Sequence, residues 1–335
     1  MAKDFKEYFE PRRAELDHAL RATLSGLLRE VPRRDAASLM DALAGGKKVR
    51  GCLSCLISDS LGGHPDAAIP RAVAVEMIQA ATLLHDDFVD QDGTRRGKPA
   101  VWTVEGARRA VLIGDVIFAS AIAMMSELSA SDGAAASRAI AEVAQGALRE
   151  PLDPRELARA IAAGRISGAL YEKIIQLKTG VLFGAACRLG AIAAGAGARL
   201  AESAYRYGLH IGEAYQIADD LQEVKEHRSR RSIRPERMMA LAPALLHFIG
   251  EEEAGPYLLA SLRGECGNFD ESASAFFACA ARLMEDEIAC RLGLAAAEIE
   301  VNFPESGYGR LLRTAPAEII GMFNESCLLP DPSLP

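Results

Sequence analysis

The sequence predicts an all-α fold on three observations. Alanine is very frequent in this chain of 335 residues, whereas the β-branched and aromatic residues that favour strands are sparse. No stretch alternates apolar and polar residues for long enough to indicate a sheet. Half of the residues are apolar, so a sizeable helical core can be buried.

Glycines and prolines separate the expected helical segments. The pair Gly45–Gly46 precedes a short apolar helix, which a second pair, Gly62–Gly63, closes. The long helix that follows begins near Pro70 and ends before the loop at Gly93. Apart from the short apolar helix, the expected helical segments are residues 5–30, 68–91, 104–130, 134–149, 154–198, 200–226, 236–263, 270–297 and 308–324.

No linker rich in proline, glycine or serine and no internal repeat divides the chain. We therefore expect one helical domain over residues 1–327, followed by a disordered tail over residues 328–335. The net charge of −8 argues against nonspecific binding of nucleic acid.

Several features indicate a cytoplasmic protein. The N-terminal segment is charged and has no apolar signal core, so secretion is not expected. Arg188 and Arg199 interrupt the most apolar segment, so we expect no transmembrane helix. The seven scattered cysteines include a lone CxxC, Cys52 and Cys55, which indicates buried thiols rather than a zinc site.

The segment LLHDDFVDQDGTRRGKPA, residues 83–100, places four aspartates and two adjacent arginines after an apolar helix. Asp86 and Asp90 are four residues apart and share one helix face, where two carboxylates repel. Mg²⁺ prefers oxygen ligands and would remove this repulsion. The acidic spacing alone favours a solvated helix end, but the apolar run before it and Arg95–Arg96 after it favour a metal-bridged diphosphate.

A second acidic cluster lies in IGEAYQIADDLQEV, residues 211–224, again after an apolar helical run. Its three acidic residues are Asp219, Asp220 and Glu223. Their spacing repeats that of Asp86, Asp87 and Asp90 in the first cluster, with the third residue three positions after the second in both. Two such clusters favour two helices that face a common cavity and hold one Mg²⁺–diphosphate group between them.

Two further segments suit an anionic ligand. GGKKVRG places Lys47, Lys48 and Arg50 beside two glycines, which let the backbone approach an anion, although a basic surface loop has the same composition. YEKIIQLKTGVLFGAA places Lys178, Thr179 and a glycine within an apolar helical pattern. This combination predicts a kink that lines a polar cavity.

Together these motifs resemble the trans-isoprenyl diphosphate synthases. The resemblance rests on GGKKVRG (45–51), AVEMIQAATLLHDDFVDQDGTRRGKPA (74–100), VLIGDVIFASA (111–121), LKTGVLFGAA (177–186) and AYQIADDLQEV (214–224), in family order. It implies a bundle of mostly antiparallel helices around a deep central cavity. It also implies head-to-tail condensation of isopentenyl diphosphate with an allylic diphosphate, three Mg²⁺ ions, and a homodimer or a heteromer.

The resemblance also assigns roles to individual residues. Asp86, Asp90 and Asp219 would bind Mg²⁺, with Asp87, Asp220 and Glu223 in support. Lys47, Arg50, Gln79 and Arg96 would bind isopentenyl diphosphate. Arg95, Lys178, Thr179 and Gln216 would hold the allylic substrate or its cation. The small side chains of Ala81 and Thr82 leave room for a growing tail, which predicts a product longer than fifteen carbons.

One segment departs from the family pattern. After the second acidic cluster, where the family usually has lysines for the allylic diphosphate, the chain reads KEHRSRRSIRPERMMALAPALL. The arginines of residues 228–237 either replace that charge and close over the diphosphate or form a solvated loop. This departure keeps open a partner subunit of a heteromer with weak or no activity. A terpene cyclase is a further alternative, although it would not need Lys47, Arg50 and Arg96.

Overall fold

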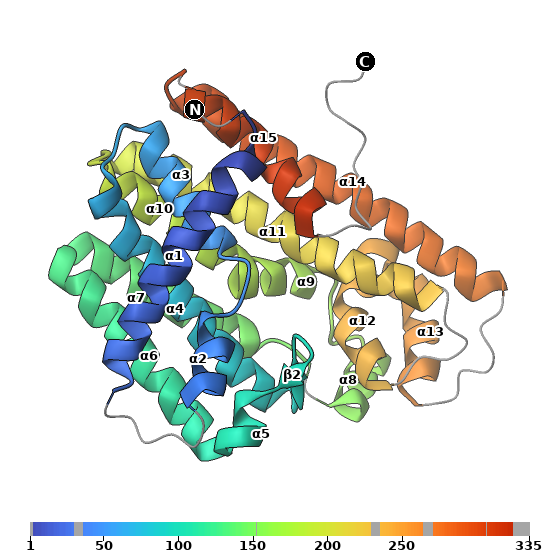
Figure 1. The fold of residues 1–335 in the computed structure, drawn as a ribbon. Coiled ribbons are helices and arrows are strands. Elements are labelled where there is room, and N and C mark those ends of the chain that lie inside the picture. The colour runs from blue at the N-terminus through green and yellow to red at the C-terminus, as the bar shows by residue number, and fades with distance from the viewer. Residues whose placement is uncertain are drawn as a thin grey trace. The chain divides into compact units, whose positions relative to one another are not determined.

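The structure, a computed structural model, describes residues 3–29, 36–151, 153–228, 235–263, 271–305 and 307–323. Within these ranges almost every element is a helix, so the all-α prediction is confirmed (Figure 1). One hairpin is an exception to the expected absence of strands, since β1 (Thr94–Arg95) pairs antiparallel with β2 (Lys98–Pro99). Strands of two residues are too short to show any alternation in the sequence.

The described residues group into two compact units. Unit 1 consists of Met1–Val143, Val181–Leu209 and Ala295–Pro316, and unit 2 of Ala144–Gly180, His210–Leu294 and Ala317–Pro335. Four helices contribute residues to both units: α7 (Ala130–Ala147), α11 (Ala198–Arg228), α14 (Glu271–Asn302) and α15 (Gly307–Phe323). The single domain over residues 1–327 stays a prediction, and the tail 328–335 lies outside the described residues.

Besides the four shared helices, unit 1 contains α1 (Phe5–Leu27), α2 (Ala36–Ala44), α3 (Val49–Ser60), α4 (Pro65–Val89), α5 (Val101–Glu105), α6 (Ala107–Leu128) and α10 (Val181–Ala193). It is built on α4, which packs against α3, α6 and α10. Glycines allow the closest approaches. A Cβ at Gly190 would lie 2.1 Å from the Ser54 carbonyl oxygen, and one at Gly114 would lie 2.3 Å from His85 Nε2. The glycine of the VLIGDV motif therefore lets α6 pack against α4 next to the first acidic cluster.

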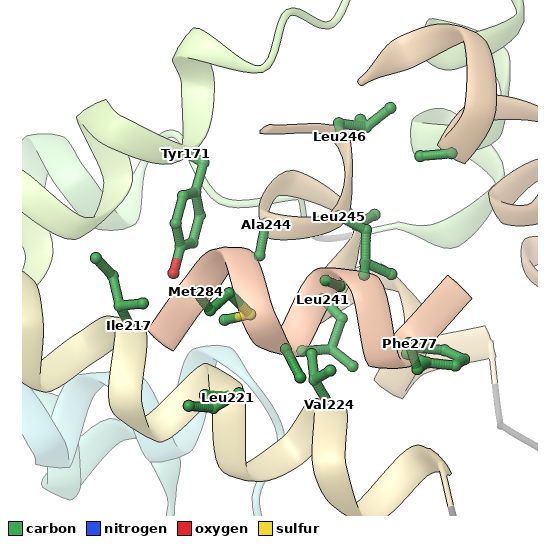
Figure 2. Packing of buried hydrophobic residues seen from close by; sticks show 14 of the residues in the cluster. Tyr171, Ile217, Leu221, Val224, Leu241, Ala244, Leu245, Leu246, Phe277 and Met284 are labelled. Atoms are coloured by element: carbon green, nitrogen blue, oxygen red, sulfur yellow. The ribbon is translucent and has the colours of Figure 1, made fainter. Parts of the chain in front are cut away.

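Unit 2 contains α8 (Pro154–Ala162), α9 (Ala169–Ile174), the π-helix η1 (Ile175–Gly180), α12 (Pro235–Ile249) and α13 (Glu251–Leu262). Asp153 begins α8 by accepting hydrogen bonds from the Arg155 and Glu156 amides, and Pro154 takes the first helical position. The core of this unit gathers apolar side chains from α9, α11, α12 and α14, among them Tyr171 and Phe277 (Figure 2).

Besides Gly106, whose φ of +89° separates α5 from α6 within the expected segment 104–130, two glycines divide the expected helical segments. The segment 154–198 is divided into α8, α9, η1 and α10, because Gly164 takes a φ of +61° just after the end of α8. Within 236–263, Gly250 takes a φ of +95° and separates α12 from α13. Both conformations favour glycine, but a single glycine in a helical pattern is a weak signal in the sequence.

Two of the described helices, α4 and α6, are long and apolar enough to cross a membrane by length and composition alone. The apolar window of α4 is 72% buried within the protein, as in the core helix of a soluble protein, whereas that of α6 is 28% buried. The absence of a transmembrane segment therefore stays a prediction. Cys52 and Cys55 are free thiols buried on α3, which confirms their interpretation as core residues.

Candidate active site

The first acidic cluster forms the C-terminal end of α4. The Asp90 amide donates to the Asp86 carbonyl over 2.8 Å, so the two residues stand one helical turn apart. Asp86 is partly buried and Asp90 is exposed. Asp87 is buried and accepts a hydrogen bond from Arg95 Nε. Burial raises the pKa of Asp87, while the Arg95 charge opposes this shift.

The hairpin after α4 brings Arg96 to the GGKKVRG segment. Arg96 and Gly97 form its two-residue turn, and both have positive φ, +53° and +73°. A Cβ at Gly45 would lie 2.8 Å from Arg96 Nη1, and one at Gly46 would lie 2.8 Å from Nη2. The guanidinium group therefore lies against the glycine backbone, and a side chain at either glycine would displace it.

A cavity of about 180 Å³ lies beside this guanidinium group. Arg95, Arg96 and Lys98 line its polar part, and side chains such as Leu84 and Val101 line its apolar part. Lys98 also pairs with Asp41 over 3.1 Å. Three basic side chains thus line a hollow next to the acidic end of α4, together with Asp41 and Asp87, which pair with Lys98 and Arg95.

The two adjacent lysines of GGKKVRG have different environments. Lys47 is exposed, whereas Lys48 is buried, takes a left-handed conformation, and donates from Nζ to the Ala44 carbonyl. Lys48 Nζ also lies 3.6 Å from Asp17, and burial lowers its pKa. Arg50 is partly buried and stacks on Phe183, with 4.3 Å from its guanidinium carbon to the ring centroid. Lys47 is therefore accessible to solvent, while Lys48 holds the loop.

Glu76 belongs to this arrangement, although the sequence analysis did not select it. Lys48 is the N-cap residue of α3 and offers no side-chain cap, and Glu76 Oε1 instead accepts from the Gly51 amide over 2.8 Å. Burial raises the pKa of Glu76, while that bond and the charges of Lys48, Arg50 and Arg96 oppose the shift. Three cations thus lie near one buried carboxylate. A glutamate within the apolar run AVAVEMIQ, one turn before Gln79, was the available signal.

The kink predicted around Lys178 is the π-helix η1. Such stretches are rare and frequently occur at functional sites. Lys178 Nζ donates to Glu150 over 2.5 Å, and a Cβ at Gly146 would lie 2.6 Å from the Lys178 backbone nitrogen. The end of α7 therefore packs directly on the π-helix. Glu150, the partner of Lys178, is a second residue, after Glu76, that the sequence did not indicate.

Hydrogen bonds connect the π-helix to the second acidic cluster on α11. Thr179 Oγ1 donates to Gln216 Oε1 over 2.8 Å, and Gln216 Nε2 donates to Asp220 Oδ1 over 3.0 Å. Tyr171, which the sequence analysis also missed, donates to Asp220 Oδ2 over 2.6 Å. Burial raises the pKa of Asp220 to about 7, while the bonds from Tyr171 and Gln216 lower it. Asp219 is partly buried.

The predicted site residues thus form two groups. Unit 1 holds Lys47, Arg50, Gln79, Asp86, Asp87, Asp90, Arg95 and Arg96, and unit 2 holds Lys178, Thr179, Gln216, Asp219, Asp220 and Glu223. That both groups act on one diphosphate stays a prediction. Of the basic stretch 228–237, Arg237 is exposed on α12, whereas Arg230, Arg231 and Arg234 lie outside the described residues.

Mg²⁺ suits the carboxylates of both clusters. Across the described part of the chain, no group of three or more His, Cys, Asp or Glu side chains is arranged to hold a metal by itself. Mg²⁺ is usually bound by one or two carboxylates together with substrate phosphates rather than by an all-protein cage. Asp86 and Asp90, one turn apart at a helix end that Arg95 and Arg96 follow, fit this mode of binding.

Comparisons with known proteins agree with these features. The polyprenyl synthetase family model matches residues 35–231. The chain is 37% identical over 183 residues to the (2E,6E)-farnesyl diphosphate synthase of Mycobacterium tuberculosis, covering 52% of this chain and 48% of that protein. It is 32% identical over 187 residues to the geranylgeranyl diphosphate synthase of Methanosarcina mazei, covering 53% of this chain and 55% of that protein.

A solved structure extends the likeness over nearly the whole chain. The polyprenyl synthetase of Streptomyces coelicolor A3(2) has a TM-score of 0.70 and 27% identity, covering 95% of this chain and 99% of that chain. In sequence, the chain spans about half the length of the curated relatives it matches. The structural likeness confirms the all-α fold that the motifs implied.

Proposed function

The chain belongs to the polyprenyl synthetase family, and on this premise we propose that it is a Mg²⁺-dependent trans-prenyltransferase. It condenses isopentenyl diphosphate with an allylic diphosphate into a longer trans-polyprenyl diphosphate. The observation that carries the proposal is the convergence in unit 1. Arg96 lies against the Gly45–Gly46 backbone, while its neighbour Arg95 pairs with Asp87 of the acidic cluster. A basic surface loop or a solvated helix end would need no such arrangement.

The reaction breaks the bond between the allylic carbon and its diphosphate oxygen and forms a carbon–carbon bond. Mg²⁺, when bound, neutralises charge on the leaving diphosphate. Lys47, Arg50 and Arg96 donate hydrogen bonds to isopentenyl diphosphate, and Arg95 and Lys178 do so to the allylic diphosphate.

Several features of the chain suit the allylic cation. The amide oxygen of Gln216 and the hydroxyl oxygen of Thr179 offer dipoles that stabilise it, while apolar walls exclude water. The alkene of isopentenyl diphosphate attacks this cation, and the proton that is then lost passes to the departing diphosphate.

Incubation with radiolabelled isopentenyl diphosphate and allylic primers of several lengths tests the proposal. We expect a labelled trans-polyprenyl diphosphate whose formation requires both substrates and Mg²⁺. A cyclic hydrocarbon made from the allylic diphosphate alone would instead identify a terpene cyclase. Absence of any turnover would contradict the proposal and favour a non-catalytic subunit.

We propose that the product is longer than fifteen carbons. Ala81 is fully buried on α4, five residues before Asp86, and Thr82 donates its hydroxyl proton to the Ile78 carbonyl over 3.0 Å. Neither side chain is large enough to close a channel along this helix. Ala81→Phe should therefore shorten the product, as measured by chromatography of the dephosphorylated alcohols. Ala81→Ser, which keeps a small side chain, is the control and should leave the chain length unchanged. An unchanged distribution in Ala81→Phe would show that the tail does not pass residue 81.

We also propose a homodimer, formed through α6. Leu112 is 51% exposed and Val116 is 38% exposed, and they share one face with the exposed Ala119 and Ala123. Such a contiguous apolar stripe suits association with a second copy. If two copies of α6 pack antiparallel about a two-fold axis, Leu112 opposes Ala123, and Val116 opposes Ala119.

The charges that flank this stripe test the register. Under the same symmetry the exposed Arg108 opposes the exposed Glu127 of the other copy. Leu112→Glu should convert the dimer to a monomer in sedimentation velocity. Arg108→Glu should weaken the dimer about tenfold, and the charge swap Arg108→Glu/Glu127→Arg should restore it. A dimer that Leu112→Glu leaves intact, or a swap that does not restore affinity, would contradict this interface. A wild-type monomer that dimerises only with another chain would indicate a heteromer.

A cytoplasmic location is consistent with the state of the cysteines. Among the described residues, Cys52, Cys55 and Cys187 are buried free thiols, and Cys279 and Cys290 are exposed free thiols. Exposed thiols persist in a reducing compartment. We therefore propose that the enzyme acts in the cytoplasm.

A further inference from the structure

A chain of hydrogen bonds in unit 2 joins four side chains from three elements. Tyr171 comes from α9, Thr179 from η1, and Gln216 and Asp220 from α11. The Tyr171 hydroxyl and the Gln216 amide donate to different oxygens of Asp220, over 2.6 and 3.0 Å, and Thr179 donates to Gln216 over 2.8 Å. Tyr171 and Gln216 therefore donate to Asp220 directly, and Thr179 donates to Gln216, so all three hydrogen bonds run in the direction of Asp220.

This direction determines what Gln216 and Thr179 offer to a substrate. Asp220 accepts from the NH₂ group of Gln216, and the amide oxygen on the other side of Gln216 accepts from Thr179. The hydroxyl proton of Thr179 is then committed to that oxygen. Gln216 Oε1 and Thr179 Oγ1 each keep an acceptor lone pair that this network does not use, and such lone pairs stabilise a cation. If the amide turned over, its NH₂ group would replace these lone pairs and repel a cation.

The apolar core holds Tyr171, at one end of this hydrogen-bond network, in a fixed position. Its side chain is 3% exposed and lies in the apolar core of unit 2, where Figure 2 shows the ring extending from α9 with its hydroxyl at the far end. The rings of His247 and Phe248 pack against it at centroid distances of 5.5 and 5.6 Å. From this packed position the Tyr171 hydroxyl donates to Asp220 Oδ2 over 2.6 Å.

We propose that Tyr171 is a positioning residue, which orients Asp220 and through it fixes the acceptor groups of Gln216 and Thr179 toward the allylic cation. The proposal rests on the proposed prenyltransferase activity for its role in catalysis. Asp220 thereby acquires an orienting role besides the metal-binding role that the motif implies, since each carboxylate oxygen has a second lone pair. Tyr171 itself touches neither substrate nor metal in this assignment.

Tyr171→Phe removes one hydroxyl and keeps the ring in its packed position. Asp220 then loses one of two donors and can rotate, which releases the Gln216 amide. We expect kcat to fall about tenfold to a hundredfold, while the KM for isopentenyl diphosphate changes less than about twofold. The KM is expected to hold because the groups proposed to bind that substrate belong to unit 1. An unchanged kcat in Tyr171→Phe would overturn the proposal.

Tyr207→Phe provides a matched control. Tyr207 is also fully buried, and its hydroxyl donates to the Leu312 carbonyl over 2.7 Å in unit 1. We expect both variants to lower the melting temperature by a similar few degrees, because each leaves one acceptor without its donor. Only Tyr171→Phe should lower kcat. An equal loss of kcat in both variants would show that Tyr171 acts through stability alone.

A double-mutant cycle and a spectroscopic measurement complete the test. If Tyr171 acts through Gln216, then Tyr171→Phe should lower kcat much less in a Gln216→Leu background than in the wild type. In the ¹⁵N spectrum, the side-chain amide signal of Gln216, identified by its absence in Gln216→Leu, should shift in Tyr171→Phe and stay in place in Tyr207→Phe. Additive effects on kcat, or an unmoved amide signal, would contradict the proposal. Because the amide signal needs no turnover, a shift in a chain without prenyltransferase activity would separate failure of the proposed function from failure of this network.

Discussion

Asp86→Ala and Asp219→Ala should each lower the rate of condensation by at least about a hundredfold, because each removes a carboxylate proposed to bind the Mg²⁺ on the leaving diphosphate. The fold should remain, since the Asp86 carbonyl still accepts from the Asp90 amide in the alanine variant. Loss of one of two neighbouring carboxylates also relieves repulsion at this helix end. We therefore expect the melting temperature of Asp86→Ala to equal or slightly exceed that of the wild type.

The control for these variants is Asp286→Ala on α14. Asp286 is 70% exposed and lies 3.6 Å from Arg282 in a surface ion pair, which contributes little to stability. Its rate should match the wild type. Excess EDTA should stop condensation by the wild-type enzyme, and added Mg²⁺ should restore it. Substantial turnover by either aspartate variant, or full activity in EDTA, would contradict the proposal that the two acidic clusters bind Mg²⁺.

The helical composition of the chain was sufficient to predict its fold class, but not the points where helices end. The interruption at Gly164 and the hairpin at residues 94–99 depend on backbone conformations that single residues adopt. The positive φ of Arg96 is the clearest case, because arginine has no intrinsic preference for it. This conformation belongs to the two-residue turn at Arg96–Gly97, and the turn leaves the guanidinium group against the Gly45–Gly46 backbone.

The motifs predicted which residues belong to the candidate site better than the hydrogen bonds and ion pairs between them. The pairing of Asp87 with Arg95 joins two residues of one motif, and the kink at Lys178–Thr179 was visible as a glycine in an apolar helix. Glu76 and Tyr171 could not be selected in this way, because a glutamate or tyrosine in a helical pattern is ordinary by itself. Their importance comes from distant partners, the Gly51 amide and the Asp220 carboxylate, which only the folded chain brings together.

Gly146→Ala should destabilise the protein and lower kcat together. The added Cβ would lie 2.6 Å from the Lys178 nitrogen and 2.9 Å from the Leu177 carbonyl carbon. These are backbone atoms, which cannot turn away as the end of a flexible side chain can. The end of α7 must therefore move from the π-helix, and Glu150, which holds Lys178 Nζ, lies just beyond that end. We expect a loss of about 1–3 kcal/mol in the free energy of unfolding, typical of overpacking.

Gly293→Ala on α14 is the matched control in the same unit. Gly293 is exposed and no atom lies within 4 Å of the position that an added Cβ would take, so alanine should raise the free energy of unfolding by about 0.5–1 kcal/mol through helix propensity alone. Chemical denaturation of the two variants should thus give changes of opposite sign, and only Gly146→Ala should lower kcat, because only Gly146 supports the backbone of Lys178 and Thr179. Equal stabilisation by both substitutions would mean that α7 does not pack this closely on the π-helix. A destabilised Gly146→Ala enzyme with wild-type kcat would mean that the position of the π-helix backbone does not govern the reaction.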